Sequence, residues 1–585
     1  MGMTAMRMQN TAEGLLVGDR HISFHLYTML FFCLSLLLTG YQVYFINHAL
    51  QLPLVYLLKN PYLYPNDPFA STLPYYASML WRAVALGSRI IPLEPLLLIL
   101  FLIERYFVIY AAGRVARVFA PESSLAVLGA MAFFSLAPTP IIGGGTIVTS
   151  YFEQTGLSIP FFLLAMAAFY RHQPIAWAVW LSLGFNLNSM YGTYALTYFG
   201  AAFFLDSTYW KAWRMWFLSF ALFLVLASPA IVFTFMAYSR EAADNTLWVI
   251  ASRVRHSDHL YPMAWSTWLL AKLGTVMALF VVLILHYKSK LEKLFKHGIA
   301  WTGVSMVWVV YAFVAAYMES PSMLVMQPAR GVDLWHCFAG IGAISILAVA
   351  FEEEGGSQVL LPVAFLASVL VLRKSFILAP LFILAPLLVF LVFFFITRVS
   401  KKRPVRIENL LASLRGNPGH LGIFLSLIVL IFGMRAFQVR LAKVPTVSGA
   451  LFVRPDPFVE QVAIWANANT PVDAMFLINP TWETFRALSK RPIFVTRKDG
   501  SAILWDRTYV TDWVERLRAF GFDIRTVNKQ DFIEELNRLY LNLSDPHVRI
   551  LKKRFPIRYW VVSVSHPSAL PIVFQNQQYK VLDLK

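Results

Sequence analysis

The sequence of 585 residues is poor in cysteine and in charged side chains. Its two cysteines, Cys33 and Cys337, both lie in apolar runs, so neither a disulfide framework nor a cysteine-rich zinc site is available. Charged residues make up 14% of the chain, whereas soluble globular proteins have roughly a quarter. The sequence also lacks a P-loop, a Rossmann glycine fingerprint after a strand and an HExxH motif. A pump that carries its own Walker motif is therefore excluded.

Apolar and aromatic residues are abundant. Hydrophobic residues make up 58% of the chain, and the mean hydropathy is +0.59. The 48 phenylalanines and 17 tryptophans fit this composition, because aromatic side chains concentrate at membrane interfaces. The composition predicts an integral membrane protein.

The formal net charge of +18 is distributed in short basic clusters between apolar runs. This distribution is typical of cytoplasmic loops under the positive-inside rule and disfavours a nucleic-acid-binding surface. The polar segment 1–23 precedes an apolar run at 24–46 that has no Ala-x-Ala cleavage signal. That run is longer than the core of a signal peptide, so it predicts an uncleaved membrane anchor.

The apolar runs predict about thirteen transmembrane helices, since each crossing needs roughly 20 mostly apolar residues. The runs are 24–46, 93–112, 124–142, 158–170, 174–190, 192–207, 213–236, 264–286, 299–318, 333–351, 357–372, 376–397 and 421–437. Basic connections alternate with longer, less basic ones, and the most basic connection is 398–415. With a cytoplasmic N-terminus, this charge bias places the C-terminus on the extracytoplasmic face.

Three segments follow from this pattern. Residues 1–23 are expected to be cytoplasmic, residues 24–437 to form the transmembrane domain, and residues 438–585 to form an extracytoplasmic domain. The first extracytoplasmic loop covers 47–92, which is too polar and too rich in proline to cross a membrane. We expect an amphipathic loop that lies on the bilayer face.

The C-terminal segment has the pattern of a small α/β domain. Asp456 followed by Pro457 predicts a helix start, with Asp as the N-cap, and the helix reaches about residue 469. β-like runs at 474–479, 492–497 and 559–564 alternate with a helical stretch at 510–520.

Two acids on the predicted outer loops are candidates for chemistry. Asp67, in the sequence YPNDPF, is the only acid of the loop 47–92, and Glu153 is the only acid of the loop 143–157. Asp67 suits either an N-cap of the following helix or a general base, and Glu153 suits either a second carboxylate or a solvated loop residue. Together the two carboxylates leave open a divalent cation, Mg²⁺ or Mn²⁺, as a cofactor.

Basic residues on the outer loops predict an anionic ligand. The loop 237–263 contains Arg253, Arg255, His256 and His259, and guanidinium groups pair with phosphate in a bidentate manner. The two histidines could also ligate a metal, although no third ligand is evident. Further along, Arg330 either binds the same anion or pairs with Asp333, one helical turn away.

These features together resemble the GT-C superfamily of polytopic glycosyltransferases, which take sugars from polyprenyl-phosphate donors. The layout is similar to that of oligosaccharyltransferase catalytic subunits and protein mannosyltransferases, and more closely to a bacterial branch of such membrane proteins. The stretches that carry the resemblance are HALQLPLVYLLKNPYLYPNDPF at 48–69, RVRHSDHLYP at 253–262, QPAR at 327–330 and the stretch 465–499.

The resemblance implies a GT-C-like α-helical fold and specific roles for individual residues. Asp67 is the implied catalytic acid of the first loop, and Glu153 is a second acid. The implied donor-phosphate ligands are Arg330, Arg253, Arg255, His256 and His259, with His48, Gln51 and Gln327 as supporting residues. The enzyme interpretation predicts that Asp67 and Arg330 line one cavity.

The implied reaction is transfer of a sugar from a polyprenyl-phosphate-linked donor to an acceptor on the extracytoplasmic face of the cell membrane. Asp67 is a single acid where many members have a pair, and the C-terminal domain lacks a WWD-type acceptor motif. Protein N-glycosylation is therefore not the expected reaction. The alternative is a non-enzymatic protein, either a lipid-linked glycan transporter or an envelope assembly scaffold. A secondary transporter is disfavoured because the sequence has no internal repeat.

Overall fold

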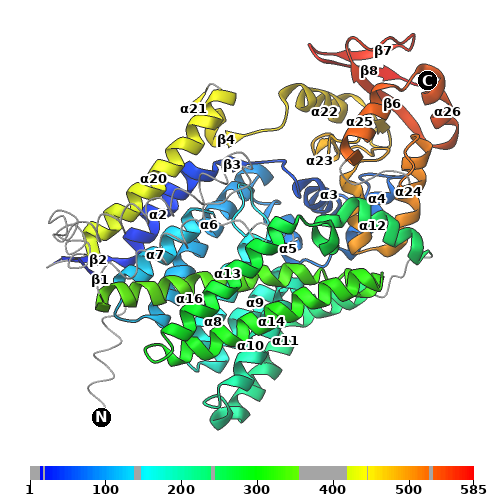
Figure 1. Ribbon diagram of the computed structural model, residues 1–585. Helices are drawn as coiled ribbons and strands as arrows, with labels where there is room; N and C mark the ends of the chain where they lie inside the picture. The colour runs from blue at the N-terminus through cyan, green and yellow to red at the C-terminus, as the bar shows by residue number, and fades with distance from the viewer. Residues whose placement is uncertain are drawn as a thin grey trace.

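The computed structural model describes residues 14–17, 20–137, 142, 147–238, 244–354, 418–444, 446–525 and 531–585. The runs expected to cross the membrane at 357–372 and 376–397, and the basic connection 398–415, lie outside these residues. The described residues form a helical bundle with a smaller C-terminal domain at one end (Figure 1).

The bundle consists of α2 (Phe24–Thr39), α6 (Leu93–Phe119), α7 (Ser124–Ser135), α8 (Gln154–Tyr170), α9 (Pro174–Leu187), α10 (Ser189–Leu205), α11 (Trp213–Tyr238), α13 (Thr267–His286), α14 (Glu292–Tyr317), α16 (Gly331–Glu354) and α20 (Pro418–Lys443). Short elements join or flank these helices: β1 (Gly14–Val17), β2 (Arg20–Ser23), η2 (Trp210–Ala212), η3 (Pro262–Ala264), α15 (Pro321–Leu324) and η4 (Pro328–Arg330). Local chemistry sets several boundaries. For example, His172 has a positive φ of 56° between α8 and α9, and Pro174 then opens α9 at its first turn.

Six of the described helical segments are long and apolar enough to cross a membrane. They are Leu93–Phe119, Trp210–Ala237, Thr267–His286, Glu292–Tyr317, Pro321–Glu353 and Leu425–Lys443. By length and composition the chain is a multi-pass membrane protein. Four further apolar helices, α2, α7, α8 and α9, have 12 to 17 residues, so the described part of the chain does not establish the larger number of crossings expected from the sequence.

The first loop folds into short helices: α3 (His48–Lys59), α4 (Pro68–Thr72), η1 (Leu73–Tyr75) and α5 (Met79–Gly87). Its apolar residues Leu50 and Trp81 share one hydrophobic core with Trp248 of α12 (Asn245–Leu260) and with Leu477 and Trp560 of the C-terminal domain. Figure 1 shows α12 between the bundle and the C-terminal domain. The amphipathic loop is thus held by the C-terminal domain through apolar burial.

The C-terminal domain contains a four-stranded sheet with the order β5-β6-β8-β7. Its strands are β5 (Met475–Leu477), β6 (Ile557–Ser563), β7 (Ile572–Gln575) and β8 (Tyr579–Asp583). Strand β5 is parallel to β6, whereas β8 is antiparallel to both β6 and β7. A separate two-residue pair joins β3 (Tyr41–Gln42) to β4 (Phe452–Val453) in parallel.

Helices and 3₁₀ turns surround this sheet. They are α21 (Val447–Leu451), α22 (Pro457–Asn469), α23 (Phe485–Ser489), η5 (Lys498–Leu504), η6 (Arg507–Tyr509), α24 (Val510–Ala519), α25 (Phe532–Leu541) and α26 (Asp545–Arg554). The helix start predicted at Asp456 is confirmed, because its carboxylate accepts a hydrogen bond of 2.8 Å from the amide of Phe458. The run 492–497 was expected to be a strand but makes only an isolated bridge between Ile493 and Phe476. It begins with Pro492, which has no amide hydrogen to donate to a ladder.

Side chains alternate between the two faces of the sheet, as the pleat requires. Leu477 and Trp560 belong to the core shared with the first loop, whereas Phe476 and Val561 belong to a core formed with α22. One face of the sheet is therefore turned toward the first loop and α12. This arrangement brings 497–507 of the C-terminal domain next to the bundle.

Candidate functional site

A cavity of about 570 Å³ lies where the first loop, the bundle, α12 and the C-terminal domain meet. This volume lies within the range of about 300–1,000 Å³ that is typical of small-molecule sites. Among the described residues of the lining, Glu153 is the only acidic one. The basic residues and histidines of the lining are Arg255, His256, His259, Arg330, Arg497, Lys498 and Arg507. The excess of basic side chains favours an anionic ligand.

Glu153 precedes the first residue of α8, and only 4% of it is exposed. Both of its neutral partners donate to the same carboxylate oxygen, Oε2: Asn47 Nδ2 at 2.8 Å and Tyr151 OH at 3.0 Å. Neither bond involves Oε1, and no described residue donates a hydrogen bond to that oxygen. Glu153 is therefore oriented by two donors and keeps one oxygen for a ligand proton.

Lys498 is linked to this carboxylate through Asn47. Its Nζ donates to Asn47 Oδ1 at 2.9 Å, while Asn47 Nδ2 donates to Glu153. Burial, followed by the positive charge of Arg255, lowers the pKa of Lys498 to about 7. The charge of this lysine consequently changes near neutral pH.

Arg330 enters the cavity from the turn that precedes α16. The preceding Gln327 has a positive φ of 47°, and its side-chain oxygen accepts a hydrogen bond of 3.1 Å from Arg330 Nη1. The guanidinium lies 5.5 Å from the ring centre of Tyr191, which is a favourable cation–π geometry. Tyr191 in turn donates to Asp333 at 2.5 Å. Arg330 and Asp333 are thus connected through Tyr191 and do not form the ion pair that the sequence left open.

Arg255 and His256 lie on α12, at a break in its helical geometry. Arg255 Nη2 donates to Ser501 at 2.7 Å, and His256 Nε2 donates to the carbonyl of Gly500 at 3.3 Å. Burial and then the charge of Arg255 lower the pKa of His256 well below its usual value, so this imidazole is neutral. Burial and then the charge of Arg497 lower the pKa of Arg255 to about 10, which keeps it charged at neutral pH.

Buried polar atoms in the lining are left without partners. They include Nε of Arg255, Nε of Arg330 and Nδ1 of His256, none of which has a hydrogen-bond partner in the described part of the chain. Nδ1 of the neutral His256 is an acceptor, because the proton of this imidazole is on Nε2. Buried polar groups are almost always paired, so the two unpaired arginine donors indicate a ligand that accepts hydrogen bonds.

Asp67 does not line this cavity. Its Oδ2 lies 2.7 Å from Nε of Arg486, and its Oδ1 accepts from the amide of Phe69 at 3.1 Å, which caps α4. The amide of Ile493 donates to Oδ2 at 3.3 Å. The expectation that Asp67 and Arg330 line one cavity is therefore corrected. The charge of this buried carboxylate is balanced by the buried guanidinium of Arg486. Of the two roles that the sequence left open for Asp67, N-cap or general base, the structure shows the N-cap.

Two other predicted residues also lie outside the lining. Arg253 forms an ion pair with Glu319, and both side chains are about half exposed. His48 is fully buried and makes a 2.9 Å hydrogen bond to the carbonyl of Phe152; burial lowers its pKa to about 4. The predicted residues that do line the cavity are Gln51, Glu153, Arg255, His256, His259, Gln327 and Arg330.

The donor set of the cavity does not resemble a metal centre. Among the described residues, no group of three or more His, Cys, Asp or Glu side chains is placed to hold a metal ion. Asp67 and Glu153, the two acids considered for Mg²⁺ or Mn²⁺, do not share the cavity. The positive charge of the lining comes from arginine and lysine side chains.

Arg497, Lys498 and Asn47 are site residues to which the sequence assigned no role. Arg497 is the last residue of the run 492–497, and Lys498 is the next residue. Both lie within the stretch 465–499 that supports the resemblance. A basic pair in a soluble domain is usually solvated, so the pair alone did not indicate a ligand site. The only available signal was its position after an apolar run.

Comparisons with known proteins give a matching family model and similar solved structures. A family model described as a domain of unknown function, DUF6798, matches residues 459–520. No curated protein sequence matches the chain. The oligosaccharyltransferase AglB from Archaeoglobus fulgidus, in complex with an inhibitory peptide and a dolichol-phosphate, is similar over 92% of this chain and 69% of that chain, with 10% identity and a TM-score of 0.40.

Two structures of ArnT from Cupriavidus metallidurans are also similar. The apo structure is similar over 96% of both chains, with 12% identity and a TM-score of 0.40. The structure bound to undecaprenyl phosphate is similar over 96% of this chain and 97% of that chain, with 11% identity and a TM-score of 0.38. The function proposed below rests on the residues of the cavity.

Proposed function

We propose that the protein is a membrane glycosyltransferase that transfers a sugar from a polyprenyl-phosphate-linked donor to an acceptor hydroxyl on the extracytoplasmic face. The observation that carries this proposal is a single oriented carboxylate, Glu153, in a cavity whose other charged groups include Arg255, Arg330 and Lys498. An acid that accepts a proton and cations that bind a phosphate are the two parts that such a transfer needs.

The proposed step is an inverting displacement. Glu153 accepts the proton of the acceptor hydroxyl through Oε1 while the acceptor oxygen forms a bond to the anomeric carbon of the sugar. The bond between that carbon and the phosphate oxygen breaks, and its electron pair stays with the leaving polyprenyl phosphate. Arg330 and Arg255 stabilise the negative charge of that phosphate. Glu153 thereby replaces Asp67 as the proposed base.

The position of the cavity suits a donor with a lipid carrier. Thr234 and Ala237 line it from the end of the apolar segment Trp210–Ala237, and Arg330 lines it from within the segment Pro321–Glu353. Both segments are apolar enough to cross a membrane. A polyprenyl tail would remain among the apolar helices while its phosphate reaches Arg330. The charge bias of the connections supports an extracytoplasmic position for this face.

The test is transfer from a panel of radiolabelled polyprenyl-phosphate hexoses by the full-length protein in lipid nanodiscs. Glu153→Gln is expected to lower transfer by about 10²- to 10⁴-fold without a change in melting temperature. Glu94→Gln is the matched control, because Glu94 is exposed and pairs with Arg454 at 3.1 Å. Asp67→Asn is expected to lower stability while transfer per folded molecule is retained.

Two results would argue against the proposal. Glu153→Gln with transfer near that of the wild type would remove the proposed base. A wild-type protein that moves lipid-linked glycans across the bilayer without any transfer would support the alternative, a lipid-linked glycan transporter.

A further inference from the structure

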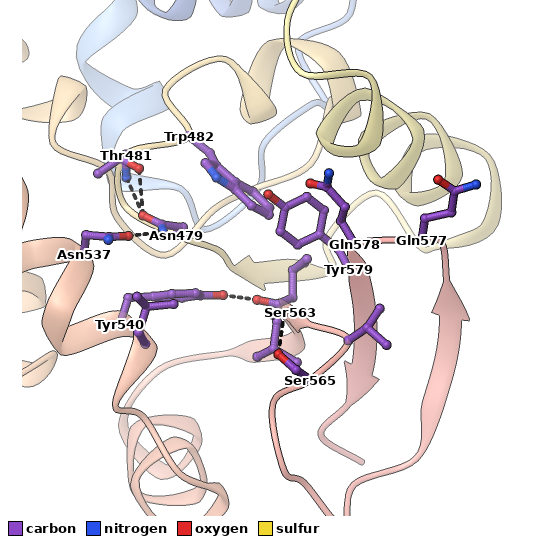
Figure 2. Close-up of a pocket in the computed structure, with 14 residues that line it drawn as sticks. Asn479, Thr481, Trp482, Asn537, Tyr540, Ser563, Ser565, Gln577, Gln578 and Tyr579 are labelled. Carbon is purple, nitrogen blue, oxygen red and sulfur yellow. Dashed lines mark hydrogen bonds between the residues drawn. The ribbon is translucent and has the colours of Figure 1, made fainter.

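A second pocket lies in the C-terminal domain, away from the cavity described above. It has a volume of about 740 Å³ and is formed where β6 ends, β8 begins and α25 packs beside them. Figure 2 shows the side chains of this pocket, with Trp482 and Tyr579 on one side and Tyr540 and Ser563 on the other. The two cavities have no lining residue in common.

The described lining of this pocket is polar and uncharged. None of the described residues in it is Asp, Glu, Lys, Arg or His. Side-chain amides and hydroxyls come from Asn479, Thr481, Asn537, Ser563, Gln577 and Gln578. Each amide offers both donors and an acceptor, and each hydroxyl offers one donor and an acceptor. A charged ligand would find no counter-charge here, whereas a ligand rich in hydroxyl groups would find partners for both its donors and its acceptors.

An aromatic surface adjoins these polar groups. The rings of Trp482 and Tyr579 meet edge to face, with centroids 4.6 Å apart and an interplanar angle of 77°. Both side chains are partly exposed. Burial of a tryptophan ring against an apolar surface is favourable, so this exposed area can be covered by a ligand. The ring is therefore available to a ligand that has an apolar face as well as hydroxyl groups.

Part of the lining is held in place before any ligand binds. Asn479 Oδ1 accepts from the amide of Thr481 at 3.0 Å and from its hydroxyl at 2.8 Å. Asn479 Nδ2 donates to Asn537 Oδ1 at 2.7 Å, so the Nδ2 group of Asn537 remains as the donor of that amide. Tyr540 donates its hydroxyl hydrogen to the carbonyl of Val561. Such preorganisation lowers the entropy lost when a ligand binds.

We infer that this pocket binds a neutral oligosaccharide. A pyranose ring has an apolar face of C–H groups that can pack on Trp482, and equatorial hydroxyls that can bond to the planar amides of Asn537 and Gln578. The absence of charge among the described lining residues separates this ligand from the phosphate-bearing molecule of the first cavity. The inference rests on this pocket alone and does not depend on the proposed glycosyltransferase activity.

An extended peptide is a less suitable ligand. Peptides that bind to sheets usually add a strand along a free edge. Strands β6 and β8, which line the pocket, pair with each other, and β8 is also paired with β7. The edge strand β7 does not contribute a residue to the lining.

The experiment uses the full-length protein in detergent and a series of short neutral glucans, mannans and N-acetylglucosamine oligomers. Binding is measured by saturation-transfer NMR and then by titration calorimetry. At least one neutral oligosaccharide is expected to bind, and Trp482→Ala is expected to weaken binding by about tenfold or more. Gln578→Ala, an exposed position, is expected to weaken it less and is the second variant if Trp482→Ala does not fold.

Matched controls separate this site from general surface effects. Gln575→Ala changes an exposed glutamine of β7 that does not line the pocket, and it is expected to leave binding unchanged. Sulfated oligosaccharides of the same length are expected to bind no better than the neutral ones. The inference is overturned if no neutral oligosaccharide binds, if Trp482→Ala and Gln578→Ala bind as well as the wild type, or if extended peptides bind in place of sugars.

Discussion

Nε of Arg486 lies 2.7 Å from Oδ2 of Asp67, across 419 positions of the sequence. The same guanidinium binds Asp499 through Nη1 at 2.6 Å, and the side chains of all three residues are at most 2% exposed. Asp67 belongs to the first loop, whereas Arg486 and Asp499 belong to the C-terminal domain. This buried network holds the two segments together, and the candidate cavity lies beside their junction.

Replacing Arg486 is expected to destabilise the protein strongly. Arg486→Met leaves the carboxylates of Asp67 and Asp499 buried without their cation, and breaking a buried ion pair in this way costs about 3–5 kcal/mol. Denaturant and thermal unfolding of the purified protein would measure the loss. The matched control is Arg554→Met, because Arg554 and its partner Glu515 are more than half exposed; a loss of at most about 1 kcal/mol is expected there. Equal effects of the two variants would contradict a structural role for the buried network.

Two of the three arginines predicted to bind phosphate, Arg330 and Arg253, are expected to behave differently. Arg330→Lys removes the planar guanidinium that lies over Tyr191 and can bind a phosphate in a bidentate manner, so donor affinity is expected to fall about tenfold. Arg253→Lys alters a guanidinium that is about half exposed, pairs with Glu319 and does not line the cavity, and affinity is expected to stay unchanged. Binding of a polyprenyl-phosphate hexose, measured by thermal shift or calorimetry, distinguishes them. A larger loss of donor affinity in Arg253→Lys than in Arg330→Lys would contradict phosphate binding in the cavity.

Donor binding is expected to weaken as pH rises above 7 because of Lys498. In the free protein the pKa of this lysine is lowered to about 7 by burial and by Arg255. A bound anion favours the protonated lysine, so above pH 7 each binding event takes up a proton. Affinity for a phosphodiester-linked sugar, whose own charge is constant, is then expected to fall by at most about tenfold per pH unit.

The control for this pH dependence is Lys498→Met, measured between about pH 6 and about pH 9. The variant is expected to bind more weakly at the acidic end and to lose most of the slope, since the arginines of the cavity keep their charge throughout. If the affinity of Lys498→Met still falls with pH as in the wild type, the proton taken up on binding belongs to another group.

Gly156 is expected to tolerate no side chain. It lies in the first turn of α8, next to Glu153, and a Cβ at this position would overlap Oε1 of Glu104. Gly156→Ala is therefore expected to destabilise the protein by about 1–3 kcal/mol and to reduce transfer, because the displaced turn carries Glu153. Gly200→Ala in α10 is the control, since a Cβ there meets nothing within 4 Å. If both variants retain wild-type stability and transfer, the close approach of Glu104 to this turn is not important.

Parts of the structure that depend on neighbouring residues could be predicted from the sequence. Asp456 caps α22 at the predicted position, because an N-cap needs only its own helix. Arg330 and Arg255, which the sequence predicts to bind phosphate, both line the cavity, and the guanidinium group suits phosphate in many settings. The run 492–497 has a strand-like composition, yet it forms only one bridge. Several of its other backbone groups bind side chains: Thr496 donates its amide to Asp499, and the carbonyl of Phe494 accepts from Arg516.

The sequence by itself determined a multi-pass membrane protein with a separate C-terminal α/β segment and basic loops suited to an anion, since apolar content and charge are properties of each residue. Only the tertiary structure decided which of the two candidate acids lines the cavity. Asp67 and Glu153 are each the only acid of their loops, but a partner 419 positions away occupies Asp67, whereas Glu153 keeps an oxygen free of protein donors in the cavity. The lowered pKa of Lys498 likewise follows from burial beside Arg255. Burial and pairing between distant segments are through-space effects, and they exist only once the chain has folded.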